Sequence, residues 1–290
     1  MKRSPAVPEA SWLDAQYDAR ARVPGVAAIF ERWRSASVLA RSAPGAQLNL
    51  RYGDGEREAL DLFVPAVPVD GLAPVLVFIH GGYWRALSKE DHSFVAPAFT
   101  AAGALVVVLD YALVPTLTVE QITLQTAQAL AWVWRHIGDH GGDRHRIAVV
   151  GHSAGGHTAA MLLSCRWKQL ADDLPQHLLT RAMSVSGLFD LEPLRRTTAL
   201  QRDLQLTPAS VARLSPAFFP RPKARLYAVV GADESDEFLR QNGLIRDVWG
   251  PTSVPVCETV PRCNHFDILH NLVNPAGRLH DLALRLLDLR

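Results

Sequence analysis

The pentapeptide G-H-S-A-G at 151–155 directly follows the apolar run Ile147–Val150, and this junction constrains the fold more than any other feature of the chain. The G-x-S-x-G pattern is typical of a sharp turn from a strand into a helix, which raises a serine hydroxyl above the edge of a sheet. The two glycines are expected where a Cβ would collide with a neighbouring strand or helix. A helical pattern begins at Ala154, so the context favours a nucleophilic serine at position 153.

Eight segments have the apolar composition of strands. The first two flank Gly53-Asp54-Gly55 and predict an antiparallel hairpin. The others alternate with helical patterns, which predicts a mostly parallel eight-stranded sheet with helices on both faces. The predicted strands are 47–52, 58–64, 75–79, 104–109, 147–150, 181–185, 225–230 and 254–260. The predicted helices are 9–42 with an interruption at Pro24-Gly25, about 88–102, 119–137 and 277–289.

The chain has 290 residues, a length that suits one α/β domain. We expect a single domain over 1–290 with an N-terminal helical extension at about 1–45. The segment 190–222 contains five prolines and is the least regular part of the pattern. It is interpreted either as a cap segment beside the active site or as a plain surface excursion.

Composition excludes several function classes. Thirty basic and 29 acidic side chains leave a net charge of +1, which gives no general attraction to nucleic acid or to an anionic membrane. No apolar signal region or 18-residue apolar span is found. The three cysteines, Cys165, Cys257 and Cys263, lack metal-type spacing and are interpreted as reduced thiols of a cytoplasmic protein. Zinc and phosphate motifs are absent, so neither a metal nor a cofactor is predicted.

A serine nucleophile needs a base to take its proton and an acid to orient that base. A cluster of acids at 231–237 follows the seventh predicted strand, and His265 follows the eighth. Both come after Ser153 in the chain, at ends of strands that lie on one edge of a parallel sheet. His265 is therefore the predicted base, whereas His270 and His280 fall in helical patterns and are predicted at the surface.

An oxyanion hole requires two backbone N–H groups aimed at the reacting carbonyl oxygen. The amide of Ala154, directly after the serine, is one candidate. The other comes from the loop after the third predicted strand, where Gly81 and Gly82 allow the backbone to approach a substrate closely.

Five motifs together resemble the kynurenine formamidases (arylformamidases) of the α/β-hydrolase superfamily, over about residues 47–290. They are H-G-G-Y-W at 80–84, D-Y-A-L-V-P at 110–115, G-H-S-A-G-G at 151–156, E-S-D-E-F at 234–238 and N-H-F at 264–266. Esterases of the hormone-sensitive-lipase type more often carry H-G-G-G in the first motif. The resemblance implies an α/β-hydrolase fold and hydrolysis of N-formyl-L-kynurenine to kynurenine and formate, without a metal.

The resemblance also implies roles for individual residues. Ser153 is the nucleophile and His265 the base, and Tyr83 or Trp84 faces the aromatic substrate. The backbones of Gly81, Gly82 and Ala154 line the oxyanion hole. Aligning the motif E-S-D-E-F places the catalytic acid at Glu234, where animal members of the family carry aspartate. Asp233 and Asp236 remain as alternative candidates for the acid.

Two other functions stay open at this point. The first is a carboxylesterase of broader short-acyl specificity that keeps the same loops. The second is a non-catalytic hydrolase fold that binds a ligand or partner. The expected partner is a small aromatic formamide or ester, and a homodimer is left open.

Overall fold

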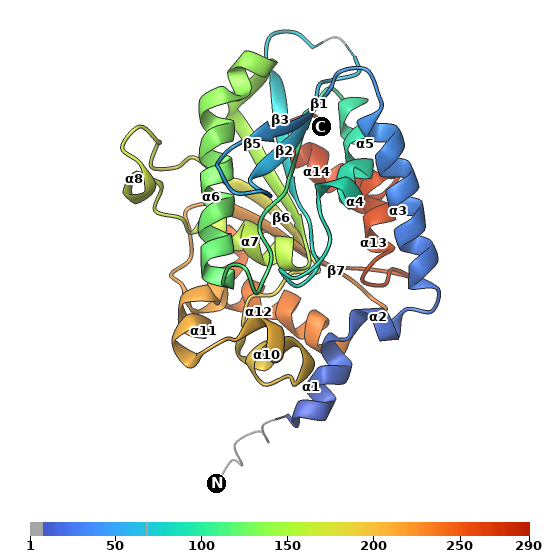
Figure 1. The fold of residues 1–290 in the computed structure, drawn as a ribbon, viewed down its shortest axis with the longest axis vertical. Helices are drawn as coiled ribbons and strands as arrows, with labels where there is room; N and C mark the ends of the chain where they lie inside the picture. The colour runs from blue at the N-terminus through green and yellow to red at the C-terminus, as the bar shows by residue number, and fades with distance from the viewer. Residues whose placement is uncertain (1–7, 68) are drawn as a thin grey trace.

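The computed structural model describes residues 8–67 and 69–290 of the chain. Its centre is one eight-stranded sheet with the strand order β1-β2-β4-β3-β5-β6-β7-β8 (Figure 1). Strand β2 is antiparallel to β1 and to β4, and every other neighbouring pair in this order is parallel. The predicted hairpin and the predicted mostly parallel sheet are therefore confirmed.

The strands are β1 Ala46–Arg51, β2 Ala59–Phe63, β3 Ala73–Ile79, β4 Leu105–Leu109, β5 Gly142–His152, β6 Arg181–Val185, β7 Arg225–Gly231 and β8 Val256–Val260. The first seven α-helices are α1 Ala10–Tyr17, α2 Ala19–Arg22, α3 Val26–Arg41, α4 Lys89–His92, α5 Ala96–Thr100, α6 Val119–His136 and α7 Ala154–Leu163. They are followed by α8 Trp167–Leu170, α9 Glu192–Arg195, α10 Ala199–Leu204, α11 Pro208–Leu214, α12 Asp236–Ser253, α13 Ile268–Val273 and α14 Arg278–Leu286. Short 3-10 turns are η1 Ser93–Val95, η2 Ile137–His140 and η3 Pro216–Phe218.

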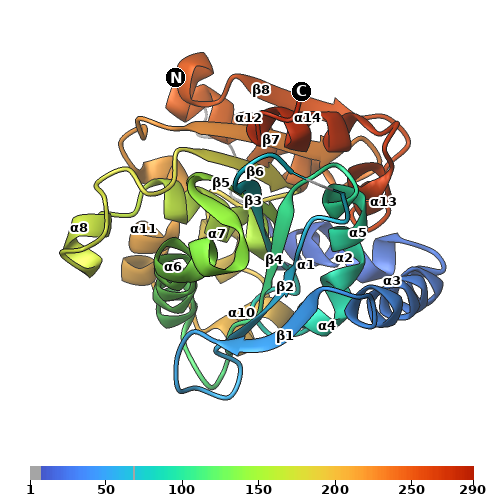
Figure 2. The ribbon, with the colours of Figure 1, turned by 90° about the horizontal axis from the view of Figure 1, so that it is seen from above.

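Both faces of the sheet are buried, as the continuous apolar strands require. Alternate side chains of β3 show this: Val75, Val77 and Ile79 pack in a cluster with residues of α6, α7 and α12. Leu76 and Phe78 point the other way, into a second cluster with residues of α3, α5 and α14. The view along the sheet in Figure 2 shows the helices in these two layers.

The segment 190–222, the least regular part of the sequence pattern, is largely helical. It forms α9, α10, α11 and η3. Three of its prolines, Pro193, Pro208 and Pro216, stand in the first turn of α9, α11 and η3. The missing N–H of proline costs nothing in a first turn, so these prolines begin helices instead of breaking them.

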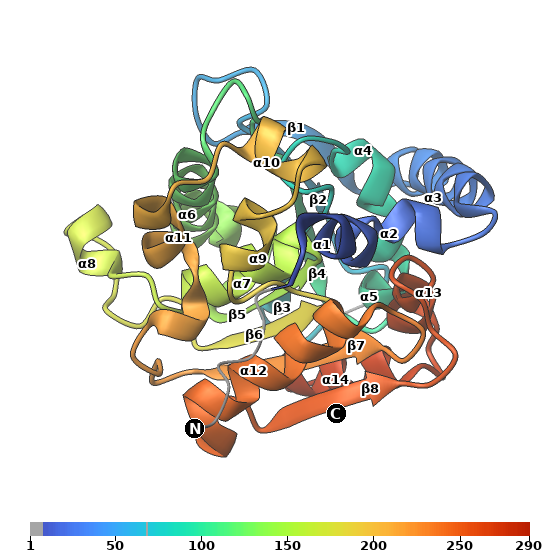
Figure 3. The ribbon, with the colours of Figure 1, turned by 90° about the horizontal axis from the view of Figure 1, so that it is seen from below.

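Helices from two distant parts of the chain cover the carboxyl edge of the sheet (Figure 3). Helix α1 contacts α9 and α12. The Asp14 carboxylate accepts hydrogen bonds from the N–H groups of Thr198 and Ala199, at 2.8 and 3.3 Å. The Tyr17 hydroxyl donates to Glu237 at 2.7 Å. The N-terminal helices are thus tied to the sheet edge where β5 ends.

Within residues 8–67 and 69–290, no helix combines the length and the apolar composition needed to cross a membrane.

Candidate active site

Ser153 occupies a strained turn between β5 and α7. Its φ of 56° and ψ of −118° are rare for a residue with a side chain, and such strain of ~1–3 kcal/mol persists only where the surroundings impose it. A Cβ on Gly151 would lie 2.0 Å from the carbonyl oxygen of Gly155 in α7. A Cβ on Gly155 would lie 2.0 Å from the carbonyl oxygen of Ile79 in β3. Both glycines of the motif are therefore required by close backbone contacts, as expected from the sequence.

A continuous chain of hydrogen bonds leads away from the Ser153 hydroxyl. The Nε2 atom of His265 lies 3.1 Å from Ser153 Oγ, and its Nδ1 atom lies 2.6 Å from Glu234 Oε2. Because a carboxylate can only accept, Nδ1 carries the proton and Nε2 is left to accept the serine proton. All three side chains are buried, so these hydrogen bonds are shielded from bulk water.

Of the three acids left open by the sequence, Glu234 is the one that contacts His265. Its side chain is fully buried, whereas Asp233 and Asp236 are exposed. The second carboxylate oxygen of Glu234 accepts hydrogen bonds from the Ser186 hydroxyl at 2.5 Å and from the Gly231 amide at 2.8 Å. These donors hold the carboxylate in one orientation. Ser186 was not predicted as a site residue, because no sequence motif distinguishes it from other serines at the ends of strands.

His152 supports the loop that carries His265. Its Nε2 atom donates to the main-chain oxygen of His265 at 2.8 Å, and the two imidazole rings lie 4.9 Å apart. Burial, followed by the nearby His265 ring, holds the pKa of His152 well below its usual value, so the ring stays neutral. His152 therefore fixes the position of His265 without adding a charge beside it.

The start of α7 and the glycine loop both lie beside Ser153. Ala154 is the first residue of α7, and such an N–H has no acceptor within its own helix. Gly81 approaches so closely that a Cβ on it would lie 2.9 Å from Ser153 Cβ. Gly82 has a φ of +109°, and a Cβ there would lie 2.1 Å from the Ala86 carbonyl oxygen. The glycine loop thus reaches the serine only because it lacks side chains.

Buried polar groups brace the start of this loop. The Tyr111 hydroxyl donates to the carbonyl oxygen of His80 at 2.7 Å, and the two rings stack at 4.2 Å. His80 Nδ1 donates to the Gly81 carbonyl oxygen at 2.7 Å. Arg57 donates to both Leu87 O and the Asp110 carboxylate at 2.6 Å. These contacts preorganise the loop, as an oxyanion hole requires.

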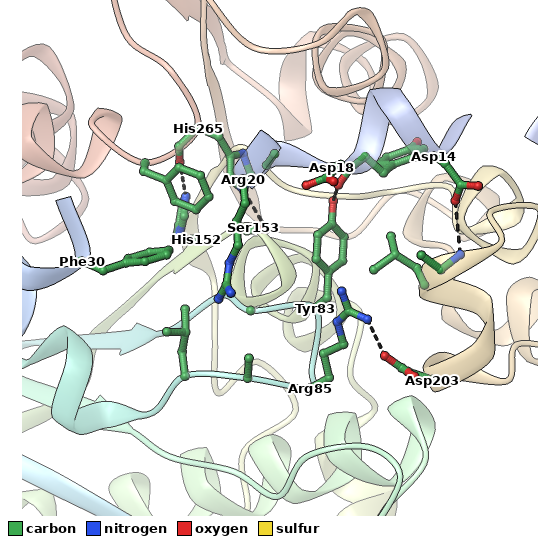
Figure 4. Close-up of a pocket in the computed structure, with 18 of the residues that line it drawn as sticks. Asp14, Asp18, Arg20, Phe30, Tyr83, Arg85, His152, Ser153, Asp203 and His265 are labelled. Carbon is green, nitrogen blue, oxygen red and sulfur yellow. Dashed lines mark hydrogen bonds and ion pairs between the residues drawn. The ribbon is translucent and has the colours of Figure 1, made fainter. Parts of the chain in front are cut away.

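Ser153 and His265 open into a pocket of about 420 Å³ (Figure 4). Its walls come from the glycine loop, from α1 to α3 and from α10, which are far apart in the sequence. Aromatic rings supply one part of the lining and charged groups another. The aromatic lining residues are Tyr17, Phe30, Trp33, Tyr83 and Phe266, and the charged ones are Asp14, Asp18, Arg20, Arg85 and Asp203.

The two aromatic residues predicted to face a substrate have different environments. Tyr83 lines the pocket and donates its hydroxyl proton to the Tyr17 carbonyl oxygen at 2.8 Å. Trp84 does not line the pocket, which corrects its predicted role. Its side chain is fully buried, with its ring 5.0 Å from that of His157. Because consecutive side chains diverge at this turn, only one of the pair can face the serine.

His280 also differs from its prediction as a surface residue. It is buried and stacks on Phe99, with the ring centroids 4.9 Å apart. Helix α14 is amphipathic and lies against the sheet, so a histidine on its inner face becomes part of the core.

The pocket walls from α1, α2 and α3 were not identified from the sequence, whereas α10 lies in the segment 190–222, for which a cap beside the active site was one of two interpretations. No motif covers these three helices, and nothing in the spacing of their residues indicates that they meet Ser153. Among residues 8–67 and 69–290, no group of three histidine, cysteine or acidic side chains is arranged to hold a metal ion.

The chain is similar to one protein family model and, over most of its length, to curated proteins. The BD-FAE family model matches residues 60–201. A kynurenine formamidase from Salmo salar is 31% identical over 256 residues, covering 86% of this chain and 84% of that protein. One from Danio rerio is 29% identical over 261 residues, covering 88% and 86%.

Solved structures share the fold. A protein from Silicibacter sp. TM1040 superposes with a TM-score of 0.81 at 28% identity, over 92% of this chain and 97% of its own. An esterase from Pyrobaculum calidifontis superposes with a TM-score of 0.67 at 18% identity, over 97% and 99%. Fold, sequence likeness and site geometry agree: this chain is a hydrolase with the α/β-hydrolase fold and belongs to the kynurenine formamidase family.

Proposed function

We propose that this chain hydrolyses an aryl formamide, with N-formyl-L-kynurenine as substrate and kynurenine and formate as products. The observation that carries the proposal is the buried chain of hydrogen bonds from Glu234 through His265 to Ser153, at the mouth of a pocket with aromatic walls. The likeness to kynurenine formamidases over most of the chain supports the choice of substrate.

In the first half of the reaction, Ser153 Oγ attacks the formyl carbon while its proton passes to His265 Nε2. The carbonyl oxygen becomes an oxyanion, which the N–H groups of Ala154 and of the Gly81-Gly82 loop stabilise. Glu234 stabilises the positive charge on the imidazole. His265 then donates its proton to the amine nitrogen, the C–N bond breaks, and the aryl amine leaves a formyl ester on Ser153.

In the second half, His265 takes a proton from water, and the resulting hydroxide attacks the formyl ester. A second oxyanion forms in the same place and is stabilised by the same N–H groups. The proton returns from His265 to Ser153 Oγ as the ester bond breaks. Formate is released and the enzyme is restored.

Steady-state hydrolysis of N-formyl-L-kynurenine, with Ser153→Ala as the blank, tests the proposal. We expect a kcat/KM above about 10⁴ M⁻¹s⁻¹, which is ordinary for an enzyme on its own substrate, and loss of that activity in the variant. Turnover of short esters without turnover of the formamide would reject the substrate and keep the serine chemistry.

A carboxylesterase of broader short-acyl specificity is the second candidate. Partial matches favour it, such as the isoprenylcysteine α-carbonyl methylesterase of Arabidopsis thaliana, 38% identical over 112 residues that cover 39% of this chain and 26% of that protein. The ratio of kcat/KM for N-formyl-L-kynurenine to that for p-nitrophenyl acetate discriminates the two functions. We expect the formamide to be strongly preferred.

The proposal includes a cytoplasmic location and leaves a homodimer open. The three cysteines are free thiols, which supports a cytoplasmic location. A homodimer is tested by light scattering coupled to gel filtration. A mass near 31.8 kDa, that of a single chain, would reject it.

A further inference from the structure

The charged groups in the wall of the Ser153 pocket divide into those held by other protein groups and two exposed ones, Asp18 and Arg20, that have no ion-pair partner among the described residues. Arg85 and Asp203 form an ion pair with each other. Asp14 accepts from two backbone N–H groups at the start of α10. Arg20 forms no ion pair with any residue that the structure describes, and Asp18 uses one oxygen to accept from the Ala21 N–H at 3.0 Å.

The position of Arg20 makes its free charge relevant to a ligand. Figure 4 shows its side chain extending from α2 into the pocket that Ser153 and Tyr83 also line. The guanidinium carbon lies 5.1 Å from the centroid of the Phe30 ring, a contact that favours the cation and leaves its N–H donors available. A planar guanidinium with free donors matches the two oxygens of a carboxylate.

Asp18 supplies the opposite charge from the same turn of the chain. It lines the same pocket, and its second oxygen has no ion-pair partner among the described residues. A wall that presents one unpaired cation and one incompletely satisfied anion is complementary to a zwitterion. A ligand with only a negative charge would also meet Asp18, and one with only a positive charge would meet Arg20.

We propose that Arg20 and Asp18 recognise the amino-acid head group of the substrate, Arg20 binding its α-carboxylate and Asp18 its α-ammonium, while the formamide end reaches Ser153. This inference rests on the proposed function. It assigns specificity to α2 and its N-cap, which lie outside the motifs around the serine. The head group contributes to binding and not to the chemical steps, so its contacts act mainly on KM.

The test uses three aryl formamides that differ only in the head group. They are N-formyl-L-kynurenine, its decarboxylated analogue formylkynuramine, and its deaminated analogue, a 4-(2-formamidophenyl)-4-oxobutanoate. The variants are Arg20→Gln and Asp18→Asn. Asparagine keeps the helix cap to Ala21, so the second change removes charge and not the start of α2. Arg32→Gln, on the exposed face of α3 and outside the pocket, controls for net charge.

We expect Arg20→Gln to lower kcat/KM for N-formyl-L-kynurenine about ten- to a hundredfold through KM, the range for a hydrogen bond to a charged group. The same change should leave formylkynuramine within about twofold, because that analogue has no carboxylate to lose. Asp18→Asn should affect N-formyl-L-kynurenine and spare the deaminated analogue in the same way. Arg32→Gln should change none of the three.

Equal losses on all three formamides, or no loss on N-formyl-L-kynurenine, would overturn the assignment of Arg20 and Asp18 and leave the formamidase function standing. Equal turnover of the three formamides by the unmodified enzyme would do the same. If the unmodified enzyme hydrolyses none of them, the proposed function fails and this inference fails with it.

Discussion

Replacing Glu234 by glutamine should nearly abolish catalysis without disturbing the fold. In the native site one carboxylate oxygen accepts from His265 Nδ1 and the other accepts from Ser186 and from the Gly231 amide. The Gly231 N–H is part of the backbone and cannot turn away. The glutamine oxygen will therefore face Ser186 and Gly231, and its NH₂ group will face His265.

This orientation reverses the hydrogen bond to the imidazole. His265 Nδ1 must then accept a proton from the amide, so the ring proton moves to Nε2. A protonated Nε2 cannot take the proton of Ser153, and the serine loses its base. An amide substitution that imposes the wrong tautomer in such a triad costs about 10⁴ in kcat, and we expect a loss of about 10³- to 10⁴-fold here.

The assay is kcat on N-formyl-L-kynurenine, with fluorophosphonate labelling of Ser153 and thermal unfolding measured in parallel. Asp233→Asn and Asp236→Asn are matched controls, because both acids are exposed and neither contacts His265. We expect them to keep kcat within about twofold, as surface changes away from the site usually do. If Glu234→Gln keeps most of its activity while either control loses it, the tautomer reasoning is refuted.

Three further predictions concern stability. Gly155→Ala should lower the free energy of unfolding by about 3 kcal/mol, the upper end for overpacking, because the new Cβ would lie 2.0 Å from the Ile79 carbonyl oxygen. Urea unfolding measures this change. An unchanged or raised stability, as helix propensity alone predicts, would contradict the prediction. Burial lowers the pKa of His157 to about 4, below its unfolded value of 6.5. The unfolded state thus binds the proton first, the free energy of unfolding should fall as pH drops from 6.5 towards 4, and His157→Gln should flatten that fall. Asp61→Ala should lower the free energy of unfolding by about 3–5 kcal/mol, because it removes the buried carboxylate that pairs with Arg41 and, at 3.1 Å, with the buried ammonium of Lys89. A loss under about 1 kcal/mol would show that Asn49 and Glu90, which also contact the Lys89 ammonium, satisfy it without Asp61.

Most of the fold could be predicted from local patterns. Every predicted strand is present, since apolar runs such as Val75–Ile79 are buried on both faces wherever they occur in a parallel sheet. Boundaries were less predictable: β5 begins at Gly142 rather than Ile147, because Gly142 pairs with Ala73 of β3 ahead of an irregularity in the register, after which Ile147 pairs with Val75. The helices of segment 190–222 were not predicted, because the sequence does not show whether a proline begins a helix or interrupts one.

The nucleophile and the base of the site could also be predicted from the sequence, because they lie in short contiguous motifs. Ser153 and its glycines form one motif, and His265 follows a strand that ends on the same edge of the sheet. The choice among Asp233, Glu234 and Asp236 was not readable from spacing, since adjacent residues in a turn point in different directions. The same limit applies to Tyr83 and Trp84, of which one lines the pocket and the other is buried in the core.

The sequence by itself thus determined the order of strands and helices, the strained serine turn and the residue types able to carry out acyl transfer, because each depends on backbone conformation and burial over a few consecutive residues. Only the tertiary structure decided which acid meets His265, which serine orients that acid and which helices close the pocket. Those contacts join residues as distant as Asp14 and Thr198, or Tyr17 and Glu237. Their pairing depends on how the helices pack over the carboxyl edge of the sheet, and no local pattern encodes that packing.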